Sequence, residues 1–258
     1  MTDTNRAEAA PDAGRIDVGI DVAVFTIRND ALHVLLAHRD SIWRLPGDRV
    51  RTEESLDLAA RRALNDVASA NTVWLEQLFT FGDIDRVPGA RVVTVAYYAL
   101  VAADAVEEDA SRPARWWAVS ALPMLGLDHR RIIEYALTRL RHKLEYTTVG
   151  FQLLPQRFTL SELQRVYEVI LGRELDKRNF RRQVEGLGIV RPTRERRVSG
   201  TGRPAQLYRF VATEAPEAVG APGPMDANQP VVHVARIGPL LRRRGRVVSV
   251  LPTDRARA

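Results

Sequence analysis

A cluster of basic side chains near residue 180 has the composition needed to recognise nucleic acid. The segment 177–187 is predicted to form a helix whose inward face holds Phe180, Val184 and Leu187. Its outward face is expected to present Lys177, Arg178, Asn179, Arg181, Arg182 and Glu185. In the major groove, arginine can form two hydrogen bonds with guanine, and asparagine can form two with adenine. These residues therefore predict a recognition helix that enters the major groove of duplex DNA.

The segments before this helix are predicted to complete a helix-turn-helix. Thr159 is expected to cap a helix, and Glu162 lies at the position that completes a capping box. Gly172 is the expected end of that helix, and Asp176 is the expected cap of the next. Two short helices joined by a tight turn are typical of a helix-turn-helix.

The segments after the helix are predicted to form a hairpin. Residues 190–198 and 203–210 have strand composition and flank a glycine-containing tip at 199–202. The hairpin contains Arg191, Arg194, Arg196, Arg197 and Arg203. Cations in this place can contact phosphates or enter a minor groove. The hairpin is therefore interpreted as the wing of a winged helix.

The distribution of charge supports a polyanionic partner for the second half of the chain. The 258-residue chain has a formal net charge of +6. Residues 1–150 contain 18 basic and 22 acidic residues, whereas residues 151–210 contain 13 and 6. Residues 231–258 contain 7 basic residues and 1 acidic residue. Neutralisation of DNA phosphates with release of counterions favours such an asymmetric chain, although a solvated cationic surface would have the same composition.

A second constellation, around residue 50, resembles the motif of the Nudix hydrolases. Gly47, Glu53 and Arg61 have the spacing of that motif and follow Leu45-Pro46. The resemblance implies carboxylates at positions 62, 65 and 66, on one face of a helix, where they would hold magnesium against a diphosphate. Here these positions are Arg62, Asn65 and Asp66, so the formal charge of that face changes from −3 to zero. We therefore predict a catalytically degenerate domain with no catalytic residues, no metal site and no cofactor.

The cleft of such a domain is nevertheless expected to bind a nucleotide. Arginine forks suit phosphates and aromatic rings suit a base. The expected effector-binding residues are Arg39, Trp43, Arg44, Arg62, Phe81 and Arg86, with His38 beside them. Arg62 is expected to replace the metal as a phosphate ligand. The alternative interpretations are that Trp43 and Phe81 only pack in the core or the cleft wall, that His38 only ends a strand, and that Arg61 is structural.

The elements that must position this cleft alternate between strands and helices. Apolar runs predict strands at 18–27 and 32–37, with a turn at Asn29-Asp30, and further strands at 73–81, 91–101 and 114–119. Periodic apolar residues predict helices at 53–70 and 125–143. The predicted fold class is α+β: an α/β/α sandwich with a mixed sheet at 16–145, followed by a winged helix-turn-helix at 146–213.

The order of the two predicted domains resembles the Nudix-related transcriptional regulators of the NrtR type. The resemblance covers roughly residues 18–210. It is sharpest in Thr80–Asp83 with Arg91–Leu100 and in Tyr146–Pro155, and it continues through Arg157–Leu160 and Leu175–Arg182 to Thr201–Tyr208. It implies a homodimeric repressor of NAD biosynthesis or salvage genes that ADP-ribose or a related nucleotide releases from operator DNA. Residues 125–146 are then the expected coupling element between the two domains.

Two other functions fit parts of the sequence. One is a Nudix diphosphatase acting on ADP-ribose or NADH, with an accessory nucleic-acid-binding domain. The other is an RNA-binding or scaffold protein that uses the wing to recognise shape. Magnesium-dependent release of AMP would distinguish the first, and competition between duplex DNA and structured RNA would distinguish the second.

Composition limits the remaining function classes. The chain has no cysteine, which excludes disulfides and thiolate metal sites. Neither an apolar run of membrane-spanning length nor a secretory signal is apparent, so a cytoplasmic protein without membrane contact is expected. We further expect a disordered leader at 1–15, a flexible linker at 214–230 and a basic tail of unassigned structure at 231–258.

Overall fold

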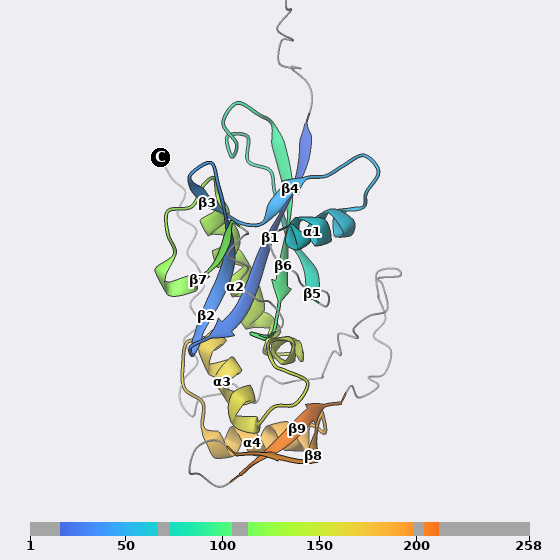
Figure 1. Cartoon of the computed structure of the whole chain (residues 1–258), viewed down its shortest axis with the longest axis vertical. Coiled ribbons are helices and arrows are strands. Elements are labelled where there is room, and N and C mark those ends of the chain that lie inside the picture. Colours follow the sequence, from blue (N-terminus) through green and yellow to red (C-terminus); the bar gives the residue numbers. More distant parts are fainter. Residues whose placement is uncertain (1–15, 67–72, 105–112, 199–203, 212–258) are drawn as a thin grey trace, which may run out of the picture.

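The computed structural model describes residues 16–66, 73–104, 113–198 and 204–211 (Figure 1). The predicted leader, linker and basic tail lie outside the described residues, as do Arg203 and the tip of the hairpin. Below, the N-terminal unit denotes residues 16–145 and the winged-helix unit denotes residues 146–211. In Figure 1 the N-terminal unit occupies the upper part of the molecule and the winged-helix unit the lower part.

The N-terminal unit is built on one mixed sheet. Its strands are β1 (Asp17–Arg28), β2 (Ala31–Arg39), β3 (Ile42–Arg44), β4 (Gly47–Arg49), β5 (Trp74–Phe81), β6 (Val92–Leu100) and β7 (Ala114–Ala118). The main order is β3-β2-β1-β6-β5, with β4 paired to β1 and β7 to β2. The pair β1–β6 is parallel and the other pairs are antiparallel, which confirms the predicted mixed sheet.

Two helices cover opposite faces of this sheet, because successive residues of β1 point to opposite sides. Val22 and Val24 pack in a cluster with Ala60 of helix α1 (Leu56–Asn65). Ala23 and Phe25 pack in another cluster with helix α2 (His129–Lys143). This arrangement confirms the predicted α/β/α sandwich.

Both helices are shorter than predicted. Helix α1 begins after Ser55, whose hydroxyl accepts a hydrogen bond from the Leu58 N–H. Its predicted end at 67–70 lies outside the described residues. Helix α2 begins at His129 rather than at 125, because Leu127 adopts a positive φ of 54° that does not fit a right-handed helix.

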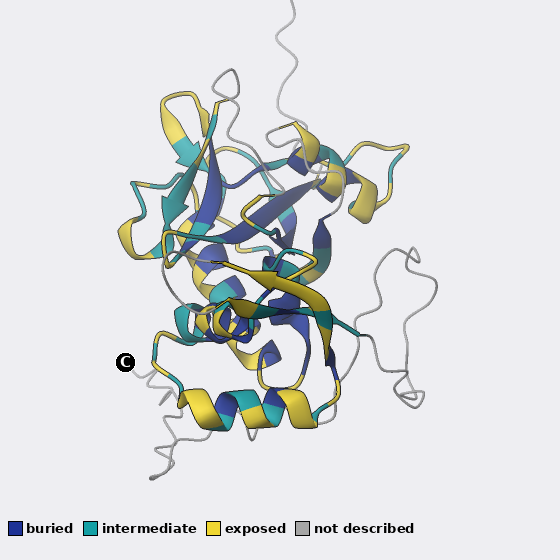
Figure 2. Ribbon diagram, turned by 60° about the horizontal axis from the view of Figure 1, so that its bottom comes forward, coloured by how far each residue is buried: buried dark blue, intermediate teal, exposed yellow. Residues whose placement is uncertain are grey.

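The winged-helix unit begins with a short 3-10 helix, η2 (Val149–Leu153), and continues with helices α3 (Leu160–Leu171) and α4 (Lys177–Gly186). The predicted capping box is confirmed: the Glu162 N–H donates to Thr159 Oγ1 at 3.1 Å, and the Thr159 N–H donates to Glu162 Oε2 at 2.7 Å. Gly172 ends α3 with a φ of 68°. Asp176 caps α4 through the Asn179 N–H at 2.7 Å. In Figure 2, α4 lies at the front with an exposed outer face.

Strands β8 (Val190–Arg197) and β9 (Ala205–Phe210) form the antiparallel hairpin of the wing. Phe158, just before α3, adds a bridge to Tyr208 of β9 and so ties the wing to the helices. This completes the predicted winged helix.

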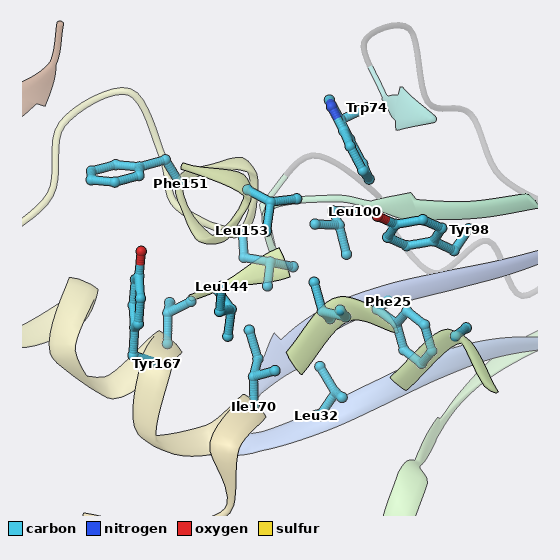
Figure 3. Packing of buried hydrophobic residues seen from close by; sticks show 14 of the residues in the cluster. Phe25, Leu32, Trp74, Tyr98, Leu100, Leu144, Phe151, Leu153, Tyr167 and Ile170 are labelled. Atoms are coloured by element: carbon cyan, nitrogen blue, oxygen red, sulfur yellow. The ribbon is translucent and has the colours of Figure 1, made fainter. Parts of the chain in front are cut away.

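One of the two apolar clusters runs through both units. Phe25, Leu100 and Leu144 of the N-terminal unit belong to the same buried cluster as Leu153 and Tyr167 of the winged-helix unit (Figure 3). Helix α2 contacts α3 directly. The two units therefore meet through side-chain packing as well as through the chain that joins them.

Within the described ranges, no helix combines the length and the apolar character that crossing a bilayer requires.

Candidate nucleic-acid interface and effector site

Helix α4 presents most of its cations to solvent. Lys177, Arg178 and Arg182 are exposed, whereas Phe180 and Val184 are buried. The Phe180 ring packs against Tyr167 of α3 with ring centroids 5.5 Å apart. Packing of one apolar face therefore fixes the helix and leaves the opposite face for a partner.

Some side chains of this face have hydrogen-bond partners within the protein and others do not. Arg182 Nη2 donates to Asn179 Oδ1 at 2.9 Å, and Arg181 Nη2 donates to Ser161 Oγ of α3 at 3.0 Å. Among the described residues, Lys177 and Arg178 have no hydrogen-bond or ion-pair partner. The first turn of α3 therefore lies beside α4, and two cations of α4 remain uncommitted.

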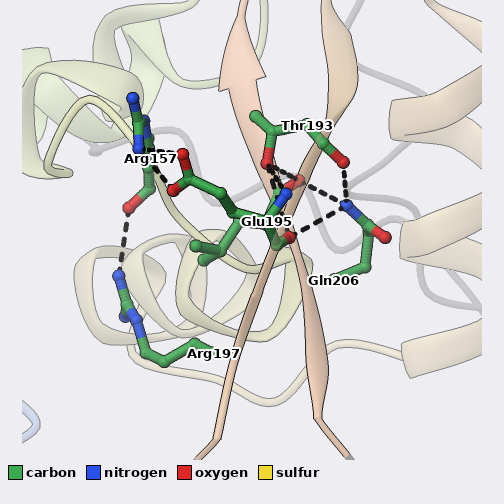
Figure 4. Close-up of polar contacts among 6 residues, drawn as sticks. Arg157, Thr193, Glu195, Arg197 and Gln206 are labelled. Carbon is green, nitrogen blue, oxygen red and sulfur yellow. Dashed lines mark hydrogen bonds and ion pairs between the residues drawn. The ribbon is translucent and has the colours of Figure 1, made fainter.

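The wing has a bulge that a glutamine side chain stabilises. The strand register shifts between Pro192 and Arg196, which leaves carbonyl groups without strand partners. Gln206 Nε2 donates to Thr193 O at 2.6 Å and to Leu207 O at 2.9 Å (Figure 4). The bulge is thus held in a defined shape.

The arginines of the wing fall into two groups. Arg191, Arg194 and Arg196 are exposed and have no ion-pair partner among the described residues. Arg197, which was predicted to contact DNA, pairs with Glu162 at 2.5 Å. Arg157, which the sequence analysis did not single out, pairs with Glu195 (Figure 4).

In the N-terminal unit, Arg62 is held by three neighbours. Its guanidinium contacts Glu54 at 2.6 and 3.0 Å, Asp48 at 2.5 Å and the Arg49 carbonyl at 2.9 Å. The hydrogen bonds from Arg62 lower the pKa of Glu54 to about 2. Arg62 therefore ties α1 to the loop that follows β4, and in this structure it does not present an open phosphate-binding fork.

Arg86 is also committed, in a buried cluster on the α2 side of the sheet. Its guanidinium contacts Asp128 at 2.7 and 3.2 Å, lies 3.5 Å from Asp21, and donates to Thr94. Beside it, His129 Nδ1 accepts the Leu45 N–H at 2.9 Å, and burial lowers the pKa of His129. Burial raises the pKa of Asp21.

The partners of Arg86 in this cluster were not predicted from the sequence. Asp21 could have been singled out, because it interrupts an otherwise apolar strand. Asp128 and His129 gave no such signal, since they begin a helix far along the chain. Their role depends on tertiary contact with Arg86.

Trp43 and Phe81, the two aromatic residues predicted to face a nucleotide, occupy different surroundings. Trp43 is half-buried, and its ring packs against His38 at 4.6 Å and Trp117 at 5.3 Å. Phe81 is 4% exposed and contacts Tyr135 of α2. The ring of Phe81 is therefore a core side chain.

The remaining predicted effector residues do not form one cluster. Arg39 is exposed and, like Arg62, lies near Asp48. Arg44 is half-buried and, like Arg86, lies near His129. The structure thus places Arg39 and Arg62 near Asp48, whereas Arg44 and Arg86 lie near His129. A side chain at Gly47 would come within 2.4 Å of Asp21 Oδ1 and Ile20 O, so the backbone there requires glycine.

The magnesium ion implied by the Nudix resemblance does not fit the residues present. No group of three metal-ligating side chains occurs among residues 16–66, 73–104, 113–198 and 204–211. The Arg62 guanidinium, rather than a carboxylate, contacts Glu54 and Asp48. A cation placed there would have to displace a guanidinium from both carboxylates.

A cavity of about 500 Å³ lies where the two units meet, away from the predicted cleft. It is bordered by Leu32, Leu137 and Val169, and two polar contacts cross the junction beside it. Arg165 of α3 pairs with Asp30 at 2.8 Å, and Arg141 Nε of α2 donates to the Ile170 carbonyl at 2.8 Å. These contacts connect the end of α2 and the β1–β2 turn with α3.

Known proteins resemble this chain over both units. Residues 150–210 match the family model of the NrtR DNA-binding winged helix domain. The ADPR responsive transcriptional repressor NtrR of Acinetobacter baylyi is 37% identical over 202 residues, which cover 74% of this chain and 80% of that protein.

Solved structures agree with this assignment. Shewanella oneidensis NrtR complexed with a 27mer DNA superposes with a TM-score of 0.69 at 33% identity, covering 75% of this chain and 93% of that chain. A MutT/nudix family protein from Enterococcus faecalis shares the fold, with a TM-score of 0.63 at 22% identity over 79% of this chain and 90% of its own. The chain therefore belongs to the NrtR family of Nudix-related transcriptional regulators.

Proposed function

We propose that this protein is a transcriptional repressor that binds operator DNA and leaves it when a nucleotide effector occupies the N-terminal unit. The observation that supports DNA binding most directly is the exposed face of α4, where Lys177 and Arg178 lie uncommitted on a capped and well-packed helix. The family supports the rest, since the Acinetobacter relative is named an ADPR responsive repressor and the Shewanella relative was solved with DNA. NAD biosynthesis or salvage genes are the proposed targets.

Helix α4 would enter the major groove, with Arg178 and Arg182 facing base edges. The exposed wing residues Arg194 and Arg196 would contact phosphates on either side of that groove. In a homodimer, two such units would read half-sites about one helical turn or a multiple of it apart. The proposed operator is therefore a palindrome.

ADP-ribose is the first candidate effector. Arg39, Trp43 and Arg44 are the proposed contacts, because they are exposed or half-buried around β3. Arg62, Phe81 and Arg86 are proposed to support the site, since all three are already engaged in internal contacts. The proposed activity is binding without hydrolysis, because Arg62 and Asn65 replace metal-binding carboxylates of the motif.

Effector binding must favour one arrangement of the two units over another to change DNA affinity. Helix α2 is the proposed coupling element: its N-terminal His129 lies against Leu45 near the proposed ligand site, and its Arg141 contacts α3. A shift at either end of this helix would reach the other end through a rigid element.

The DNA-binding proposal is tested by replacing Arg178 and Arg182 with alanine. We expect the double variant to lose about 100-fold or more in affinity for duplexes that the wild-type protein selects from a random pool, as each arginine–guanine contact contributes about 1–3 kcal/mol. The matched control is Arg61→Ala, which removes an exposed cation from the N-terminal unit. Unchanged affinity of the double variant would contradict the assignment of α4, and preferential binding of structured RNA would favour the RNA-binding alternative.

The effector proposal is tested by calorimetry with ADP-ribose and by release of the selected duplex. Trp43→Ala is expected to weaken the binding of ADP-ribose and to leave DNA affinity intact. Incubation with ADP-ribose and magnesium is expected to yield no AMP. Magnesium-dependent AMP release that disappears in Asp66→Ala would favour the diphosphatase alternative.

A further inference from the structure

Two ion pairs neutralise cations at the base of the wing. Arg157 Nη1 contacts both carboxylate oxygens of Glu195 on β8. Arg197 Nη1 contacts Glu162 Oε1 at 2.5 Å, and Arg197 Nη2 donates to the Arg157 carbonyl at 3.2 Å (Figure 4). The two pairs are linked through Arg157 and form one network.

This network lies on the proposed DNA-binding side of the unit. Glu162 is in the first turn of α3, which also holds Ser161, and Ser161 accepts a hydrogen bond from Arg181 of α4. Glu195 lies in β8 between the exposed Arg194 and Arg196. Glu162 therefore lies in the turn of α3 that contacts α4, and Glu195 lies on the wing strand that carries two exposed arginines.

The pairs contribute little to folding. The side chains of Arg157 and Glu195 are 57% and 52% exposed, and those of Arg197 and Glu162 are 42% and 40% exposed. Exposed ion pairs typically stabilise a protein by only about 0.2–1 kcal/mol. The pairs affect an approaching polyanion in two ways, because each carboxylate cancels a cation and also repels phosphate.

We propose that Glu195 and Glu162 are affinity-limiting residues that withhold Arg157 and Arg197 from DNA phosphates. Each carboxylate takes the place that a phosphate oxygen would otherwise occupy beside its arginine. This proposal rests on the proposed DNA-binding function. In this proposal the two glutamates limit the sequence-independent part of the affinity, and α4 provides base recognition.

The test is a double-mutant cycle on Arg157 and Glu195, measured by fluorescence anisotropy on a selected duplex and on a random duplex. The affinities are measured between 50 and 200 mM salt, a range over which a protein with 6–10 phosphate contacts loses about 10³–10⁵ in affinity. Glu195→Gln is expected to bind both duplexes about threefold more tightly at the lower salt, an estimate from the strength of one exposed pair. The slope of the logarithm of its affinity against the logarithm of the salt concentration should become steeper by about 0.9, which corresponds to one added phosphate contact.

The same cycle predicts what Arg157 does in each background. Arg157→Ala alone should bind both duplexes more weakly than the wild-type protein, because the Glu195 carboxylate is then unpaired and repels phosphate. Arg157→Ala in the Glu195→Gln background should abolish the gain. The control is Arg194→Ala on the same strand, which should weaken binding and make the salt dependence shallower by about 0.9.

Wild-type affinity and salt dependence in Glu195→Gln would overturn the proposal, as would a gain in Glu195→Gln that persists when Arg157 is also replaced by alanine. Glu162→Gln repeats the test at the second pair, where the glutamine oxygen can still accept the Thr159 N–H and preserve the capping box. The proposed function fails separately, if the wild-type protein binds no duplex or if Arg178→Ala/Arg182→Ala binds normally.

Discussion

Two arginines from each unit behave in opposite ways, although both units were expected to bind phosphate. In the N-terminal unit, Arg62 and Arg86 are held by carboxylates within the same fold. In the winged-helix unit, Arg178 and Arg194 are exposed and have no partner among the described residues. An arginine-rich sequence therefore indicates a phosphate site only where the fold leaves the guanidinium without an acidic neighbour.

The difference follows from where each acidic residue lies. In the N-terminal unit, strands β1 and β4 and the residue before α2 bring Asp21, Asp48 and Asp128 against the two guanidinium groups. In the winged-helix unit, the outer face of α4 holds one acid, Glu185, beyond its cations. Committed arginines hold a fold together, whereas uncommitted ones are available to a ligand.

The largest effect is expected for Arg86→Met. Removing the guanidinium leaves the buried Asp21 and the partly buried Asp128 without their cation, and loss of one partner of a buried pair costs about 3–5 kcal/mol. Urea denaturation of the full chain measures this loss. Arg39→Met, which removes an exposed arginine, is the control. A loss below about 1 kcal/mol for Arg86→Met, the range of exposed pairs, would mean that Arg86 is not a structural residue.

The opposite result is expected for Arg178→Ala. Its side chain has no partner among the described residues, so the free energy of unfolding should change by less than about 0.5 kcal/mol. Affinity for the selected duplex should fall about tenfold, which corresponds to one base contact of about 1–3 kcal/mol. The two measurements are made on the same preparation. A variant that is destabilised but binds normally would reverse the comparison.

A smaller effect is expected at the cap of α4. Asp176→Ala removes the acceptor of the Asn179 N–H, and loss of such a cap costs about 1 kcal/mol. Thermal unfolding of the full chain measures the loss. Asp176→Asn keeps a side-chain oxygen at the cap and should retain most of the stability. Equal losses in both variants would show that the carboxylate charge matters more than the hydrogen bond.

The smallest effect concerns pH. Arg62 holds the pKa of Glu54 at about 2, below its usual value of 4.5. Because the folded-state pKa is depressed, the pair stabilises the fold fully above pH 4.5, and its contribution is lost as the pH falls through about 2. In Arg62→Met, the Glu54 carboxyl should titrate near its usual value. Carboxyl NMR on the two proteins checks this, and a pKa that stays near 2 in the variant would identify another cause.

Local chemistry in the sequence predicted much of the fold correctly. The capping box at Thr159 and Glu162 and the cap at Asp176 depend on residues three apart, and the structure confirms them. The Asn29-Asp30 turn is also confirmed, with φ values of 47° and 58° that match a tight hairpin between β1 and β2.

Features that depend on distant residues could not be predicted. The short strands β3 and β4 exist because they pair with β2 and β1, not because three residues favour a strand. Arg86 finds Asp128 42 residues away, and Arg197 finds Glu162 35 residues away. The sequence therefore shows which residues are cations, but it does not show which of them are held by carboxylates of the folded protein.

The apolar core that runs from Phe25 through Leu144 to Tyr167 also determines how the molecule can be divided. The segment 150–210 has a recognisable family pattern, yet its Leu153 and Ile170 are buried in the same cluster as side chains of the N-terminal unit. Cutting the chain before Gly150 would expose that apolar surface to water and favour self-association. The segment that carries the family pattern is therefore shorter than the part of the chain that folds around this core.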